Sequence, residues 1–384
     1  MVDINRLLDQ VQEAAADRKY ANLLSSERTK IVVGLGRSVL SRVLGFDLKD
    51  WFFDSEVCLE SQLKWKLLWH QEIQDDTLIK AEVGVEFGVA LEPSLFGMQP
   101  LFREKEDPWY GEPVLQDKEK LETLELPDFH TSGLMPRVHQ LYQDISEMVK
   151  GKIPVTFPGW ARGPWSIACM LRGFTPLYVD LIDDPDFVHR LMQFIVDARI
   201  HFETQRCGFL GIDPQDTQYR WYYCVYRPSC NSALYNDEVD GNLFSPQTYR
   251  EFILPYERQL AEFYGGVSYY HSCGNMTPFF EDLCTLPNLT RLHVSQSSDL
   301  AKAMSLKGRF RIENSLDPYQ ETLRGSDAHI EEKFKTIQAA SGEKPLEVWA
   351  DAIYVGARDT VEKARNVVRI FRNVFGSIPG ESKL

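Results

Sequence analysis

The chain has 384 residues, of which 43% are hydrophobic and 26% are charged, a composition typical of globular proteins. Lys and Arg number 42 against 56 Asp and Glu, and the formal charge of −14 argues against a binder of nucleic acid or of anionic membranes, because both need a basic face. No apolar run approaches the ~20 residues of a membrane span. The first twenty residues lack the apolar segment of a signal peptide, and seven scattered Cys fit no disulfide framework, so we expect a cytoplasmic protein with reduced thiols.

The first part of the chain is predicted to be mainly helical. Apolar residues recur at the three- and four-residue spacing of a helix face over 3–24 and 56–73. Alternating Val and Phe residues predict a strand within 80–91. The Pro- and Gly-punctuated stretch 96–132 is expected to be a loop, and a helix is predicted at 134–150.

From residue 153 onward, short β-prone runs alternate with helical segments. Asp184-Pro185 and Ser245-Pro246 are typical helix starts, and the second helix is expected to bend at Pro255. The β-prone runs are 153–160, 219–226, 265–274, 290–295, 309–315 and 346–352. The predicted helices are 174–183, 185–206, 246–265, 277–286, 298–307, 327–341 and 359–376.

Four consecutive strand–helix pairs in the last third of the chain predict a parallel sheet with helical crossovers. For a chain of this length, the simplest α/β architecture with that rhythm is a (β/α)8 TIM barrel. We expect an N-terminal helical extension over residues 1–78, packed on the barrel, and the barrel itself over 79–384. A doubly wound sheet is the alternative, but the chain contains neither of the Gly-rich phosphate loops, GxGxxG or GxxxxGKS/T, that usually accompany that fold.

Polar residues follow the predicted strands at the ends where barrel enzymes carry their functional groups. They are the segment His271–Asn275, Ser295 with Ser297, Asn314, Ser315 and Asp317, and Asp351. The recurrence of such residues after four apolar strands favours an enzyme over a binding or scaffold protein built on the same frame.

His271 and Cys273 are the most specific of these residues, because alternate residues of a strand face the same side. An imidazole and a thiolate on one face suit zinc, although two ligands do not complete a site, and a buried His and Cys packed in the core are the alternative. A catalytic zinc needs a third protein ligand and an open position. Asp351 after the last strand is the first candidate ligand, and an acidic residue of the run 236–240, such as Glu238, is the second. A solvated loop is the alternative for that run.

Aromatic and amide side chains are predicted to form the rest of the site. Trp160, Tyr222 and the aromatic neighbours of Tyr222 are candidates for an apolar substrate pocket or for a cage around a quaternary ammonium. Packing in the barrel core is an equal alternative for each of them. Asn275 is expected to contact substrate, Asn314 to orient a ligand, and Asn314 and Asp351 to take part in catalysis.

The segments HSCGN (271–275) and ENSLDP (313–318) resemble the uroporphyrinogen decarboxylase superfamily. Three further segments carry the same resemblance: FPGWARGPWSIACMLRG (157–173), DDPDFVHRLM (183–192) and LFSPQTYREFILPYERQL (243–260). The resemblance covers roughly residues 80–376. The decarboxylases of this superfamily share an N-terminal Arg-Gln-x-Gly-Arg segment that binds porphyrinogen carboxylates, and the first eighty residues of this chain contain none.

The other branch of the superfamily consists of zinc-dependent, corrinoid-linked methyltransferases, whose His-x-Cys pair matches His271 and Cys273. The resemblance implies an enzyme that moves a methyl group between a small methylated substrate, a methyl ether or a methylamine, and the cobalt of a corrinoid. In the coenzyme M enzymes of that branch a further Cys follows the last strand, and Asp351 stands at that place here. A His/Cys/Asp set makes zinc more electrophilic, which favours an oxygen or nitrogen leaving group over thiol activation.

The resemblance also implies a partner protein that carries the corrinoid. DAHIEE (327–332) lacks the Gly that ends the DxHxxG cobalamin motif, and it is better interpreted as a helix N-terminus. A metal-free decarboxylase of a carboxylated tetrapyrrole or smaller acid is the alternative function. It needs cations at the barrel mouth, for which Arg162 and Arg172 are candidates, and the charge of −14 weighs against highly anionic porphyrinogens.

Overall fold

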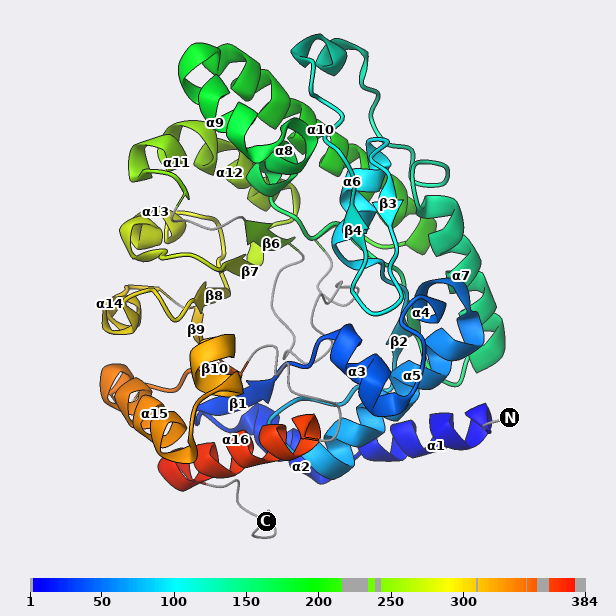
Figure 1. Ribbon diagram of the computed structural model, residues 1–384, viewed down its shortest axis with the longest axis vertical. Coiled ribbons are helices and arrows are strands. Elements are labelled where there is room, and N and C mark those ends of the chain that lie inside the picture. The colour runs from blue at the N-terminus through cyan, green and yellow to red at the C-terminus, as the bar shows by residue number, and fades with distance from the viewer. Residues whose placement is uncertain are drawn as a thin grey trace.

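The structure is a computed structural model that describes residues 3–215, 234–238, 243–308, 310–342, 344–350 and 359–376. Its helices surround a ring of strands that is open toward the viewer in Figure 1. None of the helices in these ranges has the length and apolar character needed to cross a bilayer. The predicted (β/α)8 barrel is confirmed, since parallel strands alternate with helices along the chain.

The ring strands of the described chain are all paired in parallel. They are β1 (Lys30–Val33), β2 (Val83–Gly84), β5 (Val155–Thr156), β6 (Leu234–Glu238), β7 (Val267–Ser272), β8 (Arg291–Val294), β9 (Arg311–Ser315) and β10 (Glu347–Ala350). Six of them are hydrogen-bonded in the order β1-β10-β9-β8-β7-β6, and β2 pairs with β5. A parallel bridge between Arg162 and Asp237 joins the chain after β5 to β6. The remaining strands, β3 (Pro100–Leu101) and β4 (Trp109–Tyr110), form a small antiparallel pair outside the ring.

The helices lie on the outside of the ring (Figure 1). The α-helices are α1 (Ile4–Ala15), α2 (Arg18–Ser25), α3 (Arg37–Leu44), α4 (Asp50–Phe53), α5 (Ser55–Leu68), α6 (Leu91–Leu95), α7 (Met135–Val149), α8 (Pro164–Arg172), α9 (Phe174–Asp183), α10 (Pro185–Leu210), α11 (Pro246–Phe252), α12 (Leu254–Phe263), α13 (Phe280–Leu283), α14 (Leu300–Ser305), α15 (Asp327–Ser341) and α16 (Thr360–Phe375). Shorter 3-10 or π turns are η1 (Trp69–Ile73), η2 (Gly88–Ala90), η3 (Lys118–Thr123), η5 (Thr277–Phe279) and η6 (Pro318–Leu323).

The helix ends follow the capping chemistry of the sequence. Asp184 precedes α10 and accepts a hydrogen bond from the backbone N–H of Phe187 at 3.2 Å, with Pro185 in the first turn. The same helix ends at Gly211, which has a φ of 67° that a residue without a Cβ adopts at no steric cost. The helix expected to bend at Pro255 is divided into α11 and α12 at Ile253, because a proline ring disturbs the turn that precedes it.

The sheet begins earlier in the chain than expected. The segment 1–78 was predicted to be a helical extension, but it contains β1, which pairs in parallel with β10 along its whole length. The four residues of β1 are all buried, so the strand has no alternating pattern that would reveal it in the sequence. The barrel sheet therefore starts at Lys30 rather than after residue 78.

Candidate functional site

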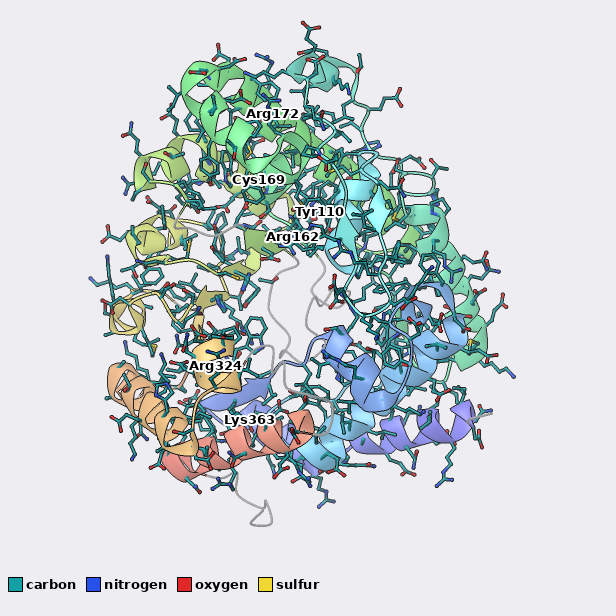
Figure 2. All side chains as sticks on the ribbon, viewed as in Figure 1. Tyr110, Arg162, Cys169, Arg172, Arg324 and Lys363 are labelled. Carbon is teal, nitrogen blue, oxygen red and sulfur yellow. The ribbon has the colours of Figure 1, made fainter. Side chains whose placement is uncertain are left out.

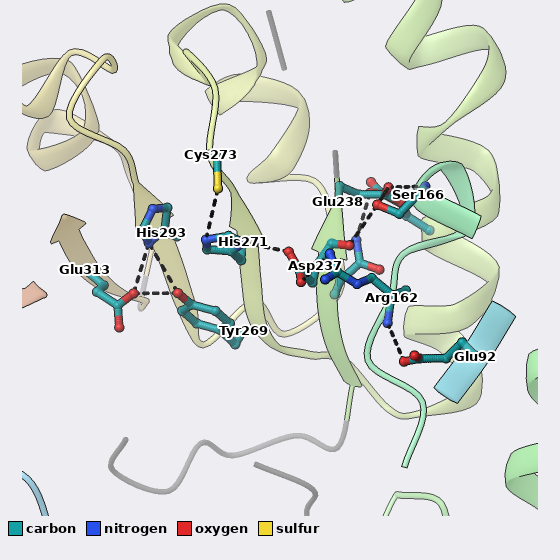
Figure 3. A network of polar contacts seen from close by, with 12 residues as sticks. Glu92, Arg162, Ser166, Asp237, Glu238, Tyr269, His271, Cys273, His293 and Glu313 are labelled. Carbon is teal, nitrogen blue, oxygen red and sulfur yellow. Dashed lines mark hydrogen bonds and ion pairs between the residues drawn. The ribbon is translucent and has the colours of Figure 1, made fainter. Parts of the chain in front are cut away.

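His271 and Cys273 lie at the carboxyl end of β7, on the side of the ring where barrel enzymes carry their chemistry. The Sγ atom of Cys273 is 3.8 Å from Nε2 of His271, as the dashed line in Figure 3 shows. Cys273 is exposed, whereas the side chain of His271 is only 13% exposed. The pair therefore presents one nitrogen and one sulfur to the same small volume at the mouth of the barrel.

Asp237 of β6 holds the other nitrogen of His271. The parallel register places Asp237 beside His271, and its Oδ1 lies 2.6 Å from Nδ1 of the ring. Burial alone would lower the pKa of His271, but the charge and hydrogen bond of Asp237, together with Cys273, raise the pKa to about 10. A carboxylate on Nδ1 is the usual outer partner of a metal-binding histidine, because it fixes the ring and directs Nε2 outward.

Arg162 holds the second oxygen of Asp237. Its Nη1 lies 2.8 Å from Oδ2, and the side chains of Arg162 and Asp237 are 17% and 6% exposed. The backbone on both sides of this contact is paired as well, since Asp237 donates to the carbonyl of Ala161 and Gly163 donates to that of Asp237. Asp237 is thus fixed between a guanidinium and an imidazole, as Figure 3 shows.

Buried charged side chains fix the loop that carries Arg162. Glu92 of α6 accepts hydrogen bonds from the N–H groups of Ala161 and Arg162 at 2.8 and 3.2 Å. From α10, Arg199 donates to the carbonyl groups of Trp160 and Arg162, at 2.7 and 2.9 Å. These contacts satisfy backbone groups of the loop that its bridge to β6 leaves unpaired, so the helix layer and β6 together set the position of Arg162.

A second histidine packs against His271 inside the ring. The ring centroids of His271 and His293 are 4.4 Å apart. Nδ1 of His293 lies 3.0 Å from Oε1 of Glu313, and the same carboxylate oxygen accepts a hydrogen bond of 2.5 Å from the hydroxyl of Tyr269. Side chains of β7, β8 and β9 thus form a buried polar layer directly beneath the His271–Cys273 pair (Figure 3).

The predicted ligand Glu238 does not face this pair. Its carboxylate accepts hydrogen bonds from the N–H groups of Trp165 and Ser166, at 3.2 and 2.8 Å, where α8 begins. Asp237 and Glu238 are consecutive strand residues and therefore point to opposite faces. The structure corrects the expectation for Glu238: burial and the nearby Glu257 raise its pKa well above the usual value, and the carboxyl group anchors α8 to β6.

The other predicted residues are distributed differently from the expectation. Asn314 is buried, and its side chain donates a hydrogen bond of 2.9 Å to the carbonyl of Val294 in the neighbouring strand. It lies on the face of β9 opposite Glu313, so its side chain links two strands of the sheet. Asn275 accepts the N–H of Thr277 and shapes the turn after Cys273. Trp160 is 3% exposed and packs on two phenylalanines, so of its two predicted roles the structure supports packing in the core and not contact with substrate.

Two expected site residues, Asp351 and Tyr222, lie outside the described residues, as do the aromatic neighbours of Tyr222. Within the ranges that the structure describes, no group of three or more His, Cys, Asp or Glu side chains is arranged to hold a metal ion. The geometry therefore provides two metal-compatible atoms with an outer carboxylate, and the third ligand stays a prediction. The sequence places Asp237 in the acidic run of possible ligands, but it does not predict that Asp237 binds Nδ1 of His271 or that His293 packs on that ring. The signal that locates Asp237 is its register with His271.

Comparisons with known proteins place these residues in a family context. The family model described as uroporphyrinogen decarboxylase (URO-D) matches residues 81–205 and 230–346. A uroporphyrinogen decarboxylase of Xanthomonas campestris pv. campestris (strain B100) is 26% identical over 176 residues, which are 44% of this chain and 43% of that protein. One of Xylella fastidiosa (strain Temecula1) is 25% identical over 175 residues, or 44% of this chain and 42% of that protein. The matches span less than half the length of these curated relatives.

A solved structure shares the fold over nearly the whole chain. It is a methyltransferase from Methanosarcina mazei, which superposes with a TM-score of 0.64 and covers 94% of this chain and 98% of its own. The sequence identity is 18%, so this likeness concerns the fold.

Proposed function

The chain belongs to the uroporphyrinogen decarboxylase family, and we propose that it is a zinc-dependent methyltransferase of that family. In this proposal it moves a methyl group between a small methylated substrate, a methyl ether or a methylamine, and the cobalt of a separate corrinoid protein. The observation that carries the proposal is the His271–Cys273 pair with Asp237 on the far nitrogen of the imidazole. The solved neighbour that bears the name methyltransferase supports the same class.

The pair has dimensions that suit zinc. Zinc binds imidazole nitrogen at about 2.0–2.1 Å and thiolate sulfur at about 2.3 Å, so two such ligands at a tetrahedral angle lie roughly 3.5 Å apart. The observed separation of Nε2 and Sγ is 3.8 Å, which needs only a small adjustment. We propose His271 and Cys273 as two ligands and Asp351 as the third, with one position left for substrate. When bound, zinc supplies a Lewis acid that stabilises negative charge on the heteroatom that loses the methyl group.

The residues around the pair prepare His271 for this role. Asp237 accepts the Nδ1 proton and leaves Nε2 as the atom that faces Cys273, while Arg162 neutralises the second oxygen of Asp237. The packing of His293 limits rotation of the His271 ring. A side chain that is held in one orientation before the metal binds loses little conformational entropy when it becomes a ligand. The fixed ring of His271 therefore favours metal binding.

In this proposal another protein carries the corrinoid. This part of the proposal rests on the resemblance of the His-x-Cys segment to that of the corrinoid-linked methyltransferases. Residues 327–332 form the first turns of α15, with Ser326 accepting the N–H of His329, so this segment is a capped helix start, as the sequence indicates. The barrel mouth beside exposed Cys273 is the proposed place of docking.

The alternative is a metal-free decarboxylase, the activity named for the curated relatives. A decarboxylase of this kind needs cations that hold substrate carboxylates. Arg172 instead binds Asp180 at 2.7 Å and two backbone carbonyl groups, and it lies among the helices rather than at the ring (Figure 2). Arg162 lies at the ring but is ion-paired with Asp237. Both candidate cations have protein partners, which favours the methyltransferase.

A methyl-transfer assay separates the two functions. Purified protein with reduced cobalamin is incubated with methyl ethers and methylamines in turn, and the conversion of Co(I) to methyl-Co(III) is followed by absorption. We expect conversion with one substrate class and none with the Cys273→Ala variant. Absence of conversion with every substrate, together with metal-free protein that decarboxylates porphyrinogen-like acids, would establish the alternative.

A further inference from the structure

A small cavity lies between the helix layer and the sheet, and it shares no lining residue with the His271–Cys273 site. It is bounded by Trp51 of α4, Lys66 of α5 and the chain around β2, and its volume is about 30 Å³. One water molecule needs roughly 10–15 Å³ of such space, so this cavity accommodates a group of a few heavy atoms. At its edge, Gln62 of α5 binds both backbone groups of Gly84, at 2.9 Å each, where β2 lacks a second strand neighbour in the described chain.

Two of the residues that line this cavity carry a strong hydrogen-bond donor without a protein acceptor in the described chain. Lys66 is 2% exposed, and within the described ranges its ammonium group forms no hydrogen bond or ion pair. Trp51 is also 2% exposed, and its indole N–H has no hydrogen-bond partner within the same described ranges. Burying a donor without an acceptor is unfavourable, and burying an isolated charge is more unfavourable still. An acceptor in the cavity would relieve both costs.

The carboxylates in the cavity wall compensate Lys66 only in part. Glu86 lines the cavity but is engaged in an ion pair with Arg37. Glu82 is half-buried and attracts the ammonium group, but burial has the larger effect and lowers the pKa of Lys66 to about 8. The positive charge of Lys66 is therefore under-compensated by the protein.

We propose that this cavity binds a small monoanion of the size of formate, between the Lys66 ammonium and the Trp51 indole N–H. The volume suits a ligand of a few heavy atoms, and the apolar side chains of Val83 and Val85 in the wall disfavour a dianion. A monoanion accepts hydrogen bonds from both donors and supplies the charge that Glu82 only partly provides. This site is independent of the proposed methyl transfer.

Binding of [13C]formate to the full-length protein, followed by its NMR line width, tests the proposal. Lys66→Met keeps the length of the side chain and removes its charge, and we expect at least tenfold weaker binding, because a hydrogen bond to a charged group is worth about 1.5–3 kcal/mol. Trp51→Phe keeps a ring and removes one donor, so binding weakens severalfold. Glu82→Gln removes a competing carboxylate and tightens binding. Lys64→Met is the matched control, because Lys64 is a half-buried residue of the same helix that already has a partner, Glu60.

The proposal is overturned if the wild-type protein does not broaden the formate signal, which would indicate a cavity filled by water. It is also overturned if Lys66→Met and Lys64→Met bind formate equally. Should Lys66→Met fail to fold, the formate affinities of Trp51→Phe and Glu82→Gln decide the question. The proposal expects the first variant to bind formate more weakly and the second more tightly, and unchanged affinities in both would contradict the proposal. Competition by chloride separates a general monoanion site from a carboxylate-selective one.

Discussion

Replacing Asp237 with Asn removes one negative charge from a position between the His271 ring and the Arg162 guanidinium. The Oδ1 atom of Asp237 lies 2.6 Å from Nδ1 of His271, and Oδ2 lies 2.8 Å from Nη1 of Arg162. Asn has nearly the same shape and retains one acceptor oxygen, so the fold should survive. The change therefore isolates the electrostatic contribution of this carboxylate to the proposed zinc site.

The expected loss can be estimated from the burial of the pair. Removing the outer partner of a metal-ligating histidine typically costs 10–100-fold in metal affinity, or about 1.4–2.7 kcal/mol. The side chains of His271 and Asp237 are only 13% and 6% exposed, so solvent screens their interaction weakly. We therefore expect Asp237→Asn to lie in the upper part of this range.

Competition with a chromophoric chelator measures the zinc affinity of both proteins. Asp282→Asn serves as the control, because it removes a carboxylate that pairs with the exposed Arg250, whose side chain is 57% exposed. Thermal melting of each variant verifies the fold. An Asp237→Asn protein with wild-type zinc affinity, or with the same loss as Asp282→Asn, would refute the assigned role of Asp237.

Three further changes test the surroundings of the site. In Gly163→Ala the new Cβ would overlap the carboxyl group of Glu238, and we expect a loss of about 1–3 kcal/mol in urea unfolding; a neutral result would show that α8 is not tightly anchored there. Glu92→Leu leaves two backbone N–H groups of the loop after β5 without an acceptor, which should destabilise the protein by about 1–3 kcal/mol in the same assay; equal midpoints would contradict this. Burial raises the pKa of Glu257, so the folded protein keeps a proton that the unfolded chain releases, and this stabilisation is lost as pH rises through the folded pKa. The melting temperature should then fall between pH 5 and pH 8 more steeply for wild type than for Glu257→Gln, and parallel curves would refute it.

The barrel could be predicted because the last third of the sequence repeats one rhythm. Helices α15 and α16 carry clear apolar faces and alternate with β9 and β10, and a parallel sheet with helical crossovers follows from that order. The strand β1 could not be predicted in the same way, since it is four residues long and buried on both faces. Its assignment to the sheet depends on its pairing with β10, a contact between the two ends of the chain.

The site was predictable only where neighbouring residues determine it. His271 and Cys273 are two positions apart, and their common face follows from strand geometry. The acidic run 236–240 contains several carboxylates that the local sequence does not distinguish. The register of β6 against β7 shows that Asp237, and not Glu238, lies beside His271. Trp160 was expected to contact substrate because an aromatic residue looks alike in a pocket and in a core, and only packing separates the two.

Metal binding by His271 and Cys273 is the central claim, and cobalt substitution tests it most directly. Co(II) is added to the metal-free wild-type protein and to the variants His271→Ala and Cys273→Ser, and the absorption spectra are compared. The account predicts one Co(II) per wild-type chain with a sulfur-to-cobalt charge-transfer band in the near ultraviolet, no such band in Cys273→Ser, and weak binding in His271→Ala. A Cys273→Ser protein that binds Co(II) with the wild-type spectrum would contradict it.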